Sequence, residues 1–166
     1  MIEEAALLNR VQELGDAISR DYAGRRPLLL GVLNGAFIFA ADLVRACSID
    51  CEMSFIKLSS YKGTQSTGEI TQMIGLETPV ENRHVILVED IIDSGHTMAH
   101  FLPALRLLQP ASIAVAALLF KPDALVHPVH IDYLGFEIPN HFVVGYGLDY
   151  NGLGRNLRAI YQLEGA

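Results

Sequence analysis

The stretch HVILVEDIIDSGHTM, residues 84–98, decides the fold, because an apolar run passes directly into carboxylates, a glycine and a threonine. The run VILV at 85–88 contains no polar residue, which is typical of a strand covered on both faces in a parallel sheet. Beyond it, apolar residues recur at the helical period: Met98, Phe101, Leu102, Leu105 and Leu108. The stretch therefore predicts a buried strand, a short turn and a helix.

The same alternation extends over the rest of the chain. Apolar runs at 28–33 and 113–120 predict two more buried strands, and helical spacing predicts an amphipathic helix over 3–22 that ends at Gly24. A further helical pattern follows the first strand: Phe37, Ala40, Ala41 and Val44. Strands that alternate with helices predict an α/β fold with a mainly parallel, twisted sheet flanked by helices.

Two segments fit this pattern less well. Pro103 lies inside the third helical pattern, and a proline beyond the first turn predicts a kink or a late helix start. Residues 59–76, SSYKGTQSTGEITQMIGL, are polar and only weakly periodic, and they predict a long hairpin or a mobile loop. Long loops in compact proteins often act as lids over a site.

Length and composition narrow the function. The 166 residues suit a single domain, and a net charge of −7 with a pI near 5.2 argues against a nucleic-acid or anionic membrane partner. The two cysteines, Cys47 and Cys51, form neither a disulfide framework nor a metal-binding spacing. The acidic N-terminus MIEEAALLNR does not resemble a signal peptide, so we expect a cytoplasmic protein.

The carboxylates of the opening stretch lie where a parallel strand ends, which is where ligands bind in α/β sheets. A helix that starts between Ser94 and Thr97 would direct backbone N–H groups at that point, and Gly95 would allow close approach of an anion. Glu89 and Asp90 could bind vicinal hydroxyls or help to hold a metal, and Asp93 is placed to act as a base. These features together predict a sugar-phosphate site, whereas a simple N-cap by Asp93 or Ser94 would explain only part of them.

The stretch VILVEDIIDSGHT resembles the phosphoribosyl-pyrophosphate (PRPP) signature of the phosphoribosyltransferases. Four further stretches resemble the hypoxanthine-guanine branch of that family in order and spacing: GVLNGAFIFAADL at 31–43, SSYKGTQSTGEI at 59–70, LLFKP at 118–122 and GFEIPNHFVVGYGLDYN at 135–151. The resemblance implies the type I phosphoribosyltransferase fold, with a small hood region formed by the terminal segments. It also implies transfer of the phosphoribosyl group from PRPP to a 6-oxopurine with Mg²⁺ as cofactor, in a homodimer or homotetramer.

The resemblance also implies a role for individual residues. On the PRPP side, it assigns Asp93 as the catalytic acid-base group, Glu89 and Asp90 to the ribose and the metal, and the backbone of Ser94, Gly95, His96 and Thr97 to the 5′-phosphate. On the pyrophosphate side, it assigns Leu33, Asn34, Gly35 and Arg155, with a non-proline cis peptide at Leu33-Asn34. On the purine side, it assigns Lys121, Phe142, Val143 and Asp149, with Asp149 also as a metal ligand. Lys57, Ser60 and Tyr61 fall near or on the flexible loop.

The sequence departs from the family pattern at one place, and it allows two other functions. Gly152, Leu153 and Gly154 stand where relatives usually have an acidic and an aromatic residue, which predicts a more flexible loop before Arg155. A regulator that binds PRPP without turnover would share the fold, but Asp93 and Lys121 are both present and favour an enzyme. A transferase for another base would share only residues 89–97. Each functional role also has a structural alternative. Lys121 could be a surface lysine, Phe142 could belong to the strand core, and Arg155 could form a solvated ion pair.

Overall fold

The computed structural model describes residues 1–61 and 70–163. Its helices are α1 (Glu4–Asp21), α2 (Phe37–Ala46), α3 (His96–Leu107) and the short 3-10 helix η1 (Pro122–Ala124). Its strands are β1 (Leu28–Leu33), β2 (Glu52–Tyr61), β3 (Ile70–Ile74), β4 (His84–Ile92), β5 (Ser112–Phe120), β6 (Tyr133–Glu137), β7 (Val143–Val144) and β8 (Tyr161–Gln162). The expected strands at 28–33, 85–88 and 113–120 and the helix at 3–22 are therefore confirmed.

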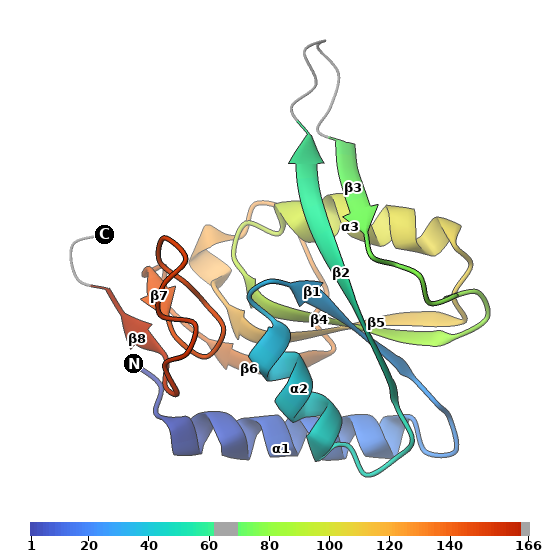
Figure 1. Ribbon diagram of the computed structural model, residues 1–166, viewed down its shortest axis with the longest axis horizontal. Coiled ribbons are helices and arrows are strands. Elements are labelled where there is room, and N and C mark those ends of the chain that lie inside the picture. Colours follow the sequence, from blue (N-terminus) through green and yellow to red (C-terminus); the bar gives the residue numbers. More distant parts are fainter. Residues whose placement is uncertain (62–69, 164–166) are drawn as a thin grey trace.

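The main sheet has the strand order β3-β2-β1-β4-β5-β6. Strands β2, β1, β4, β5 and β6 run parallel, and β3 pairs antiparallel with β2 at one edge. Figure 1 shows the twisted sheet with α1 and α2 on one side and α3 on the other. The predicted α/β class is thus correct, and β1 and β4 lie side by side in the middle of the sheet.

Two apolar layers explain why the central strands have no polar face. On one side, α1 and α2 pack through residues such as Leu7 and Phe39 against sheet residues such as Ile86 of β4. On the other side, α3 packs through Met98, Phe101 and Leu105 against the alternate residues of the same strands. Because each central strand is covered twice, its side chains are apolar on both faces, as the continuous runs predicted.

The structure also settles the two irregular segments. Helix α3 runs from His96 to Leu107 with Pro103 inside it, so the expected late start is wrong. Pro103 and Ala99, whose carbonyl would accept the missing hydrogen bond, are both exposed, so water can satisfy that carbonyl while the buried side of α3 packs on the sheet. The hairpin expected within 59–76 is present as the β2–β3 pair, and its tip lies outside the described residues.

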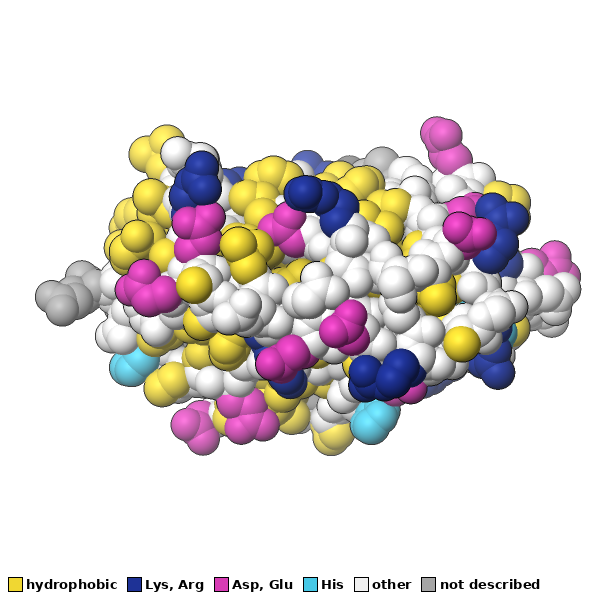
Figure 2. All heavy atoms as spheres, turned by 90° about the horizontal axis from the view of Figure 1, so that it is seen from below, with side chains coloured by type: hydrophobic (Ala, Val, Ile, Leu, Met, Phe, Trp, Pro, Cys, Tyr) yellow, Lys and Arg dark blue, Asp and Glu magenta, His cyan; other side chains and the backbone are white. Residues whose placement is uncertain are grey.

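The two ends of the chain form the expected hood. Strands β7 and β8 pair antiparallel in a small separate sheet, and Ile2 bridges Ile160. In Figure 1 this part, coloured orange to red, lies beside the start of α2 and above the N-terminal end of α1. Figure 2 shows the face that includes α1, where acidic and basic side chains are interspersed with apolar ones.

Within the described ranges, no helix combines the length and apolar character needed to cross a membrane.

Candidate active site

The predicted PRPP-binding residues lie where β4 meets α3. Gly95 has a left-handed backbone with φ of 75° and forms the N-cap of α3. The Ser94 N–H donates to the Asp93 carboxylate, and the Ser94 hydroxyl accepts a hydrogen bond of 3.3 Å from the His96 N–H. The Ser94 carbonyl in turn accepts hydrogen bonds from the Val126 and His127 N–H groups, at 3.0 and 2.9 Å. The turn is therefore held from both sides, and the N-terminal end of α3 is directed toward the carboxyl edge of the sheet.

Gly95 has no room for a side chain. A Cβ atom built on it would lie 2.2 Å from the carbonyl oxygen of His127. Together with the left-handed φ, this contact explains why the turn requires glycine at this position. The close approach fixes the backbone that would surround an anion at the start of α3.

Glu89 and Asp90 lie in the second half of β4, and their side chains have different surroundings. Glu89 is buried and lines a small cavity with Asp93, Gly95 and other residues at the start of α3. Burial raises the pKa of Glu89 well above its usual value, and the adjacent Asp90 carboxylate raises that pKa further. Burial also raises the pKa of Asp90, to about 6, against the stabilising effect of the Ile91 N–H. A cation or a hydrogen-bond donor would therefore be strongly attracted to this pair.

Arg155 and Asp149 form an ion pair close enough to Asp90 to affect the pKa of its carboxyl group. Arg155 forms an ion pair of 2.5 Å with Asp149 and donates a hydrogen bond of 2.7 Å to the Gly147 carbonyl. The Arg155 charge lowers the pKa of Asp90 and the Asp149 charge raises it, so the three charged groups interact electrostatically. Residues that lie far apart in the sequence thus form one charge cluster.

The loop before Arg155, for which the sequence predicts flexibility, forms a hydrogen-bonded turn. The Gly152 N–H donates to the Asp149 carboxylate at 2.7 Å, and Tyr150 and Leu153 exchange backbone hydrogen bonds. Gly152 and Gly154 have φ of 82° and 88°, a conformation that glycine adopts without strain. The glycines therefore shape the turn that presents Arg155.

The predicted pyrophosphate turn follows β1 and contacts β4 directly. The Leu33-Asn34 peptide is cis, as the family resemblance implied. A Cβ atom on Gly35 would lie 1.4 Å from Asp90 Oδ2, so only a glycine allows the Asp90 carboxylate to rest against this turn. The turn and the carboxylate therefore form one surface.

The predicted purine side is formed by Lys121, Phe142 and Val143. Lys121 directly follows β5; it is buried, with 8% of its surface exposed, and its N–H donates to the Ile92 carbonyl at 2.9 Å. Val143 is buried in β7, whereas Phe142 is 44% exposed. The Phe142 ring meets the ring of Tyr150 edge to face at 5.6 Å. The buried position of Lys121 argues against the surface-lysine alternative, and the exposure of Phe142 argues against strand core.

The residues predicted for the flexible loop and for the metal are not brought together into one site. Lys57 is exposed on β2, and Ser60 and Tyr61 pair with Thr71 and Ile70 at the end of the β2–β3 hairpin. Across residues 1–61 and 70–163, no three His, Cys, Asp or Glu side chains are grouped so that they could hold a metal ion by themselves. The expected set of Glu89, Asp90 and Asp149 is therefore not assembled as one protein-only metal site.

Sequence reasoning missed Tyr150 and the contacts of Gly147. Tyr150 is 48% exposed beside Phe142, and a Cβ atom on Gly147 would lie 2.2 Å from the Gly35 carbonyl oxygen. The alternation of Gly145, Tyr146 and Gly147 was the available signal, since two glycines around one aromatic are unusual in a buried strand.

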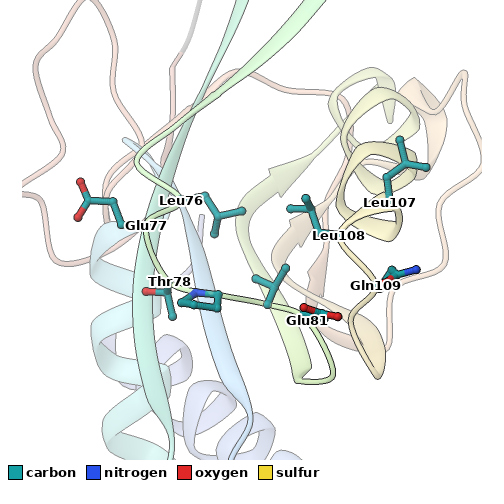
Figure 3. A pocket seen from close by; sticks show the side chains of 9 residues that line it. Leu76, Glu77, Thr78, Glu81, Leu107, Leu108 and Gln109 are labelled. Carbon is teal, nitrogen blue, oxygen red and sulfur yellow. The ribbon is translucent and has the colours of Figure 1, made fainter.

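A surface groove lies away from this site (Figure 3). One wall comes from residues 76–81, which precede β4, and the other from the end of α3, including Leu107 and Leu108. It therefore lies toward the amino end of β4, whereas the predicted PRPP-binding residues lie at its carboxyl end. Figure 3 shows Leu76 and Leu108 on its opposite walls.

A parallel sheet whose carboxyl edge carries a glycine turn at a helix start, an acidic pair and an arginine is typical of proteins that bind phosphorylated sugars. Comparisons with known proteins make this class specific. The family described as Phosphoribosyl transferase domain matches residues 1–151, and the chain belongs to this family.

Its relatives lie in the hypoxanthine-guanine branch. The chain is 41% identical over 167 residues to the hypoxanthine-guanine phosphoribosyltransferase of Bacillus subtilis, covering all of this chain and 93% of that protein. It is 42% identical over 158 residues to the bifunctional protein TilS/HprT of Listeria innocua, but it spans only 24% of the length of that relative and 95% of its own. The crystal structure of a hypoxanthine-guanine phosphoribosyltransferase from Bacillus anthracis superimposes with a TM-score of 0.92 at 35% identity, covering 99% of this chain and 97% of that one.

Proposed function

We propose that this chain transfers the 5-phosphoribosyl group of PRPP to a 6-oxopurine, hypoxanthine or guanine, and so serves purine salvage. The observation that carries this proposal is the meeting of three segments at the carboxyl edge of the sheet. The Gly35 turn touches Asp90, the Gly147 turn touches Gly35, and Arg155 interacts with Asp90. This arrangement would offer anion contacts beside the carboxylate of Asp90, as a sugar bearing a pyrophosphate requires.

The reaction breaks the bond between C1′ of the ribose and the pyrophosphate oxygen and forms a bond from C1′ to N9 of the purine. Positive charge develops on the ribose ring and negative charge on the leaving pyrophosphate. Glu89 and Asp90 would bind the ribose hydroxyls and the Asp90 carboxylate would offset the positive charge, while Arg155 and the backbone of 33–35 would stabilise the pyrophosphate. Asp93 would accept the proton that the purine loses.

The carboxylates suit Mg²⁺, although they do not form a protein-only cage. Mg²⁺ usually binds one or two carboxylates together with phosphate oxygens and waters. Asp149 lies near enough to Asp90 that its charge raises the pKa of Asp90, so together with PRPP oxygens the two carboxylates would complete such a site. When bound, Mg²⁺ would neutralise the charge of the pyrophosphate.

Lys121 supports the choice of base. Its ammonium is a hydrogen-bond donor only, so it favours a purine with an acceptor oxygen at position 6. Adenine carries an amino group there and would leave the charge of Lys121 facing a donor. Phe142 and Tyr150 would supply an aromatic surface for the flat base.

The experiment is an assay of pyrophosphate release from PRPP with hypoxanthine, guanine, xanthine and adenine in turn. We expect release with hypoxanthine or guanine and none above background with adenine. Equal kcat/KM values for adenine and hypoxanthine would contradict the proposal, and PRPP binding without release would favour a regulator. The homodimer or homotetramer and the cytoplasmic location stay predictions from the sequence, and sedimentation would test the former.

A further inference from the structure

Tyr146 carries a buried hydroxyl that none of the proposed catalytic steps uses. It lies in the turn after β7, is 4% exposed, and has a φ of 50°, which is uncommon for a residue other than glycine. Its hydroxyl donates a hydrogen bond of 2.6 Å to Asp42 Oδ2 on α2. The partners are 104 residues apart in the sequence, so this bond joins two separate parts of the fold.

The backbone of this turn is bound to the segment that carries Arg155. The Tyr146 N–H donates to the Leu157 carbonyl at 2.8 Å, and the Gly147 N–H donates to the Arg155 carbonyl at 3.0 Å. The Gly147 carbonyl accepts from the Arg155 guanidinium. Any shift of the turn would therefore move both the backbone and the side chain of Arg155.

The opposite side of the same turn rests on the pyrophosphate turn. A Cβ atom on Gly147 would lie 2.2 Å from the Gly35 carbonyl oxygen, so the two backbones are in direct contact. Helix α2, which carries Asp42, begins at Phe37, directly after that turn, and the Phe37 N–H donates to the Asn34 carbonyl. The Tyr146 hydroxyl is thus bonded to the helix that extends from residues 33–35.

We propose that Tyr146 and Asp42 are a positioning pair that holds Arg155 and the 33–35 turn at the correct separation for pyrophosphate. This inference rests on the proposed function, because it concerns how the same site binds the leaving group. Neither residue touches the substrate in this account; both act through the two turns that do. Of the residues predicted for the purine side, Lys121 follows β5 and lies outside this linkage.

The chain contains a matched control for this bond. The Tyr133 hydroxyl donates to Asp21 Oδ2 at 2.8 Å, and Tyr133 is also buried. Tyr133 is the first residue of β6 and Asp21 the last of α1, so this bond lies at the amino edge of the sheet. The substitution Tyr133→Phe removes the same chemical group without touching either turn.

The test compares Tyr146→Phe, Asp42→Ala, Asp42→Asn and Tyr133→Phe with the wild type. For Tyr146→Phe we expect the KM for PRPP to rise about tenfold while the KM for hypoxanthine changes less than about twofold. Asp42→Ala should have the same effect and the double variant no greater one, because both changes remove a single interaction. Asp42→Asn should behave like the wild type, since its amide oxygen can still accept the hydrogen bond from the Tyr146 hydroxyl. Tyr133→Phe should leave both KM values unchanged.

A second readout does not depend on turnover. Titration of each protein with inorganic pyrophosphate in the presence of Mg²⁺ should show about tenfold weaker binding for Tyr146→Phe and wild-type binding for Tyr133→Phe. Equal pyrophosphate affinity of Tyr146→Phe and the wild type would overturn the positioning pair. So would an equal rise in the KM for PRPP and for hypoxanthine, which would indicate general loss of structure. A wild type that binds pyrophosphate but shows no transfer would contradict only the proposed function.

Discussion

The substitution Gly95→Ala tests whether the turn at the start of α3 depends on close backbone approach. Gly95 has a φ of 75°, and alanine in this left-handed region costs about 1 kcal/mol. The added Cβ would also lie 2.2 Å from the His127 carbonyl oxygen, where ordinary contact begins at 3.4 Å, so the 94–97 backbone and that carbonyl would have to move apart by roughly 1.2 Å. Such overpacking costs a further ~1 to 3 kcal/mol.

Gly24 provides the matched control, because its φ is 73° and a Cβ there would have no atom within 4 Å. Gly24→Ala should therefore lose only the conformational part, about 1 kcal/mol, and its melting temperature should fall by ~2 to 4 °C. Gly95→Ala should lose about 3 kcal/mol and melt about 6 to 12 °C below the wild type.

The assay pairs urea unfolding with steady-state kinetics. A displacement near 1 Å in the 94–97 backbone should raise the KM for PRPP at least about tenfold in Gly95→Ala, whereas Gly24→Ala should keep the wild-type KM. Equal stability losses and equal KM values for the two variants would refute the reasoning, because the backbone conformation alone would then explain Gly95.

Three further predictions follow from single side chains. Asp93→Asn keeps an oxygen that can accept the Ser94 N–H, so kcat should fall by about 10² to 10⁴ with an unchanged KM for PRPP, and unchanged turnover would exclude Asp93 as the base. Lys121→Ala should lower kcat/KM for hypoxanthine by at least about tenfold while PRPP affinity measured by titration stays the same; a variant that uses hypoxanthine normally would contradict this role. Burial raises the pKa of the Cys47 thiol to about 12, so iodoacetamide at pH 8 should alkylate native Cys47 about a thousandfold more slowly than urea-unfolded protein, and faster as the pH rises; equal rates at pH 8 would contradict the burial argument.

The central strands could be predicted because a continuous run of apolar residues within each strand indicates its burial. Leu28 to Leu30 and Ala116 to Leu119 are fully buried, and strands with helices on both faces need apolar side chains at every position. The acids and the glycine at 89–97 could be predicted for the same reason, since one strand, its turn and the next helix are continuous in the sequence.

Contacts between distant segments could not be predicted from pattern. The spacing of apolar residues does not give the strand order, so the contact of Gly35 with Asp90 depends on β1 and β4 being neighbours in the folded sheet. Tyr146 lies in an apolar stretch and resembles core until its hydroxyl is seen to reach Asp42. The family resemblance supplied residue roles without these supporting contacts, because it is defined by motifs and not by packing.

The charge cluster at the carboxyl edge explains why the site should respond strongly to its ligands. Asp90 and Asp149 carry two negative charges when ionised, and Arg155 supplies one positive charge that is already engaged by Asp149 and the Gly147 carbonyl. Burial is the main cause that raises the pKa of Asp90 to about 6, and the Asp149 charge adds a smaller contribution that the Arg155 charge opposes. A divalent cation would supply the missing positive charge and would become a new partner for Asp149. Arg155 could then turn from Asp149 to an incoming pyrophosphate at little cost. Since each ligand stabilises the charge state that favours the other, Mg²⁺ and pyrophosphate should bind together more tightly than either binds alone.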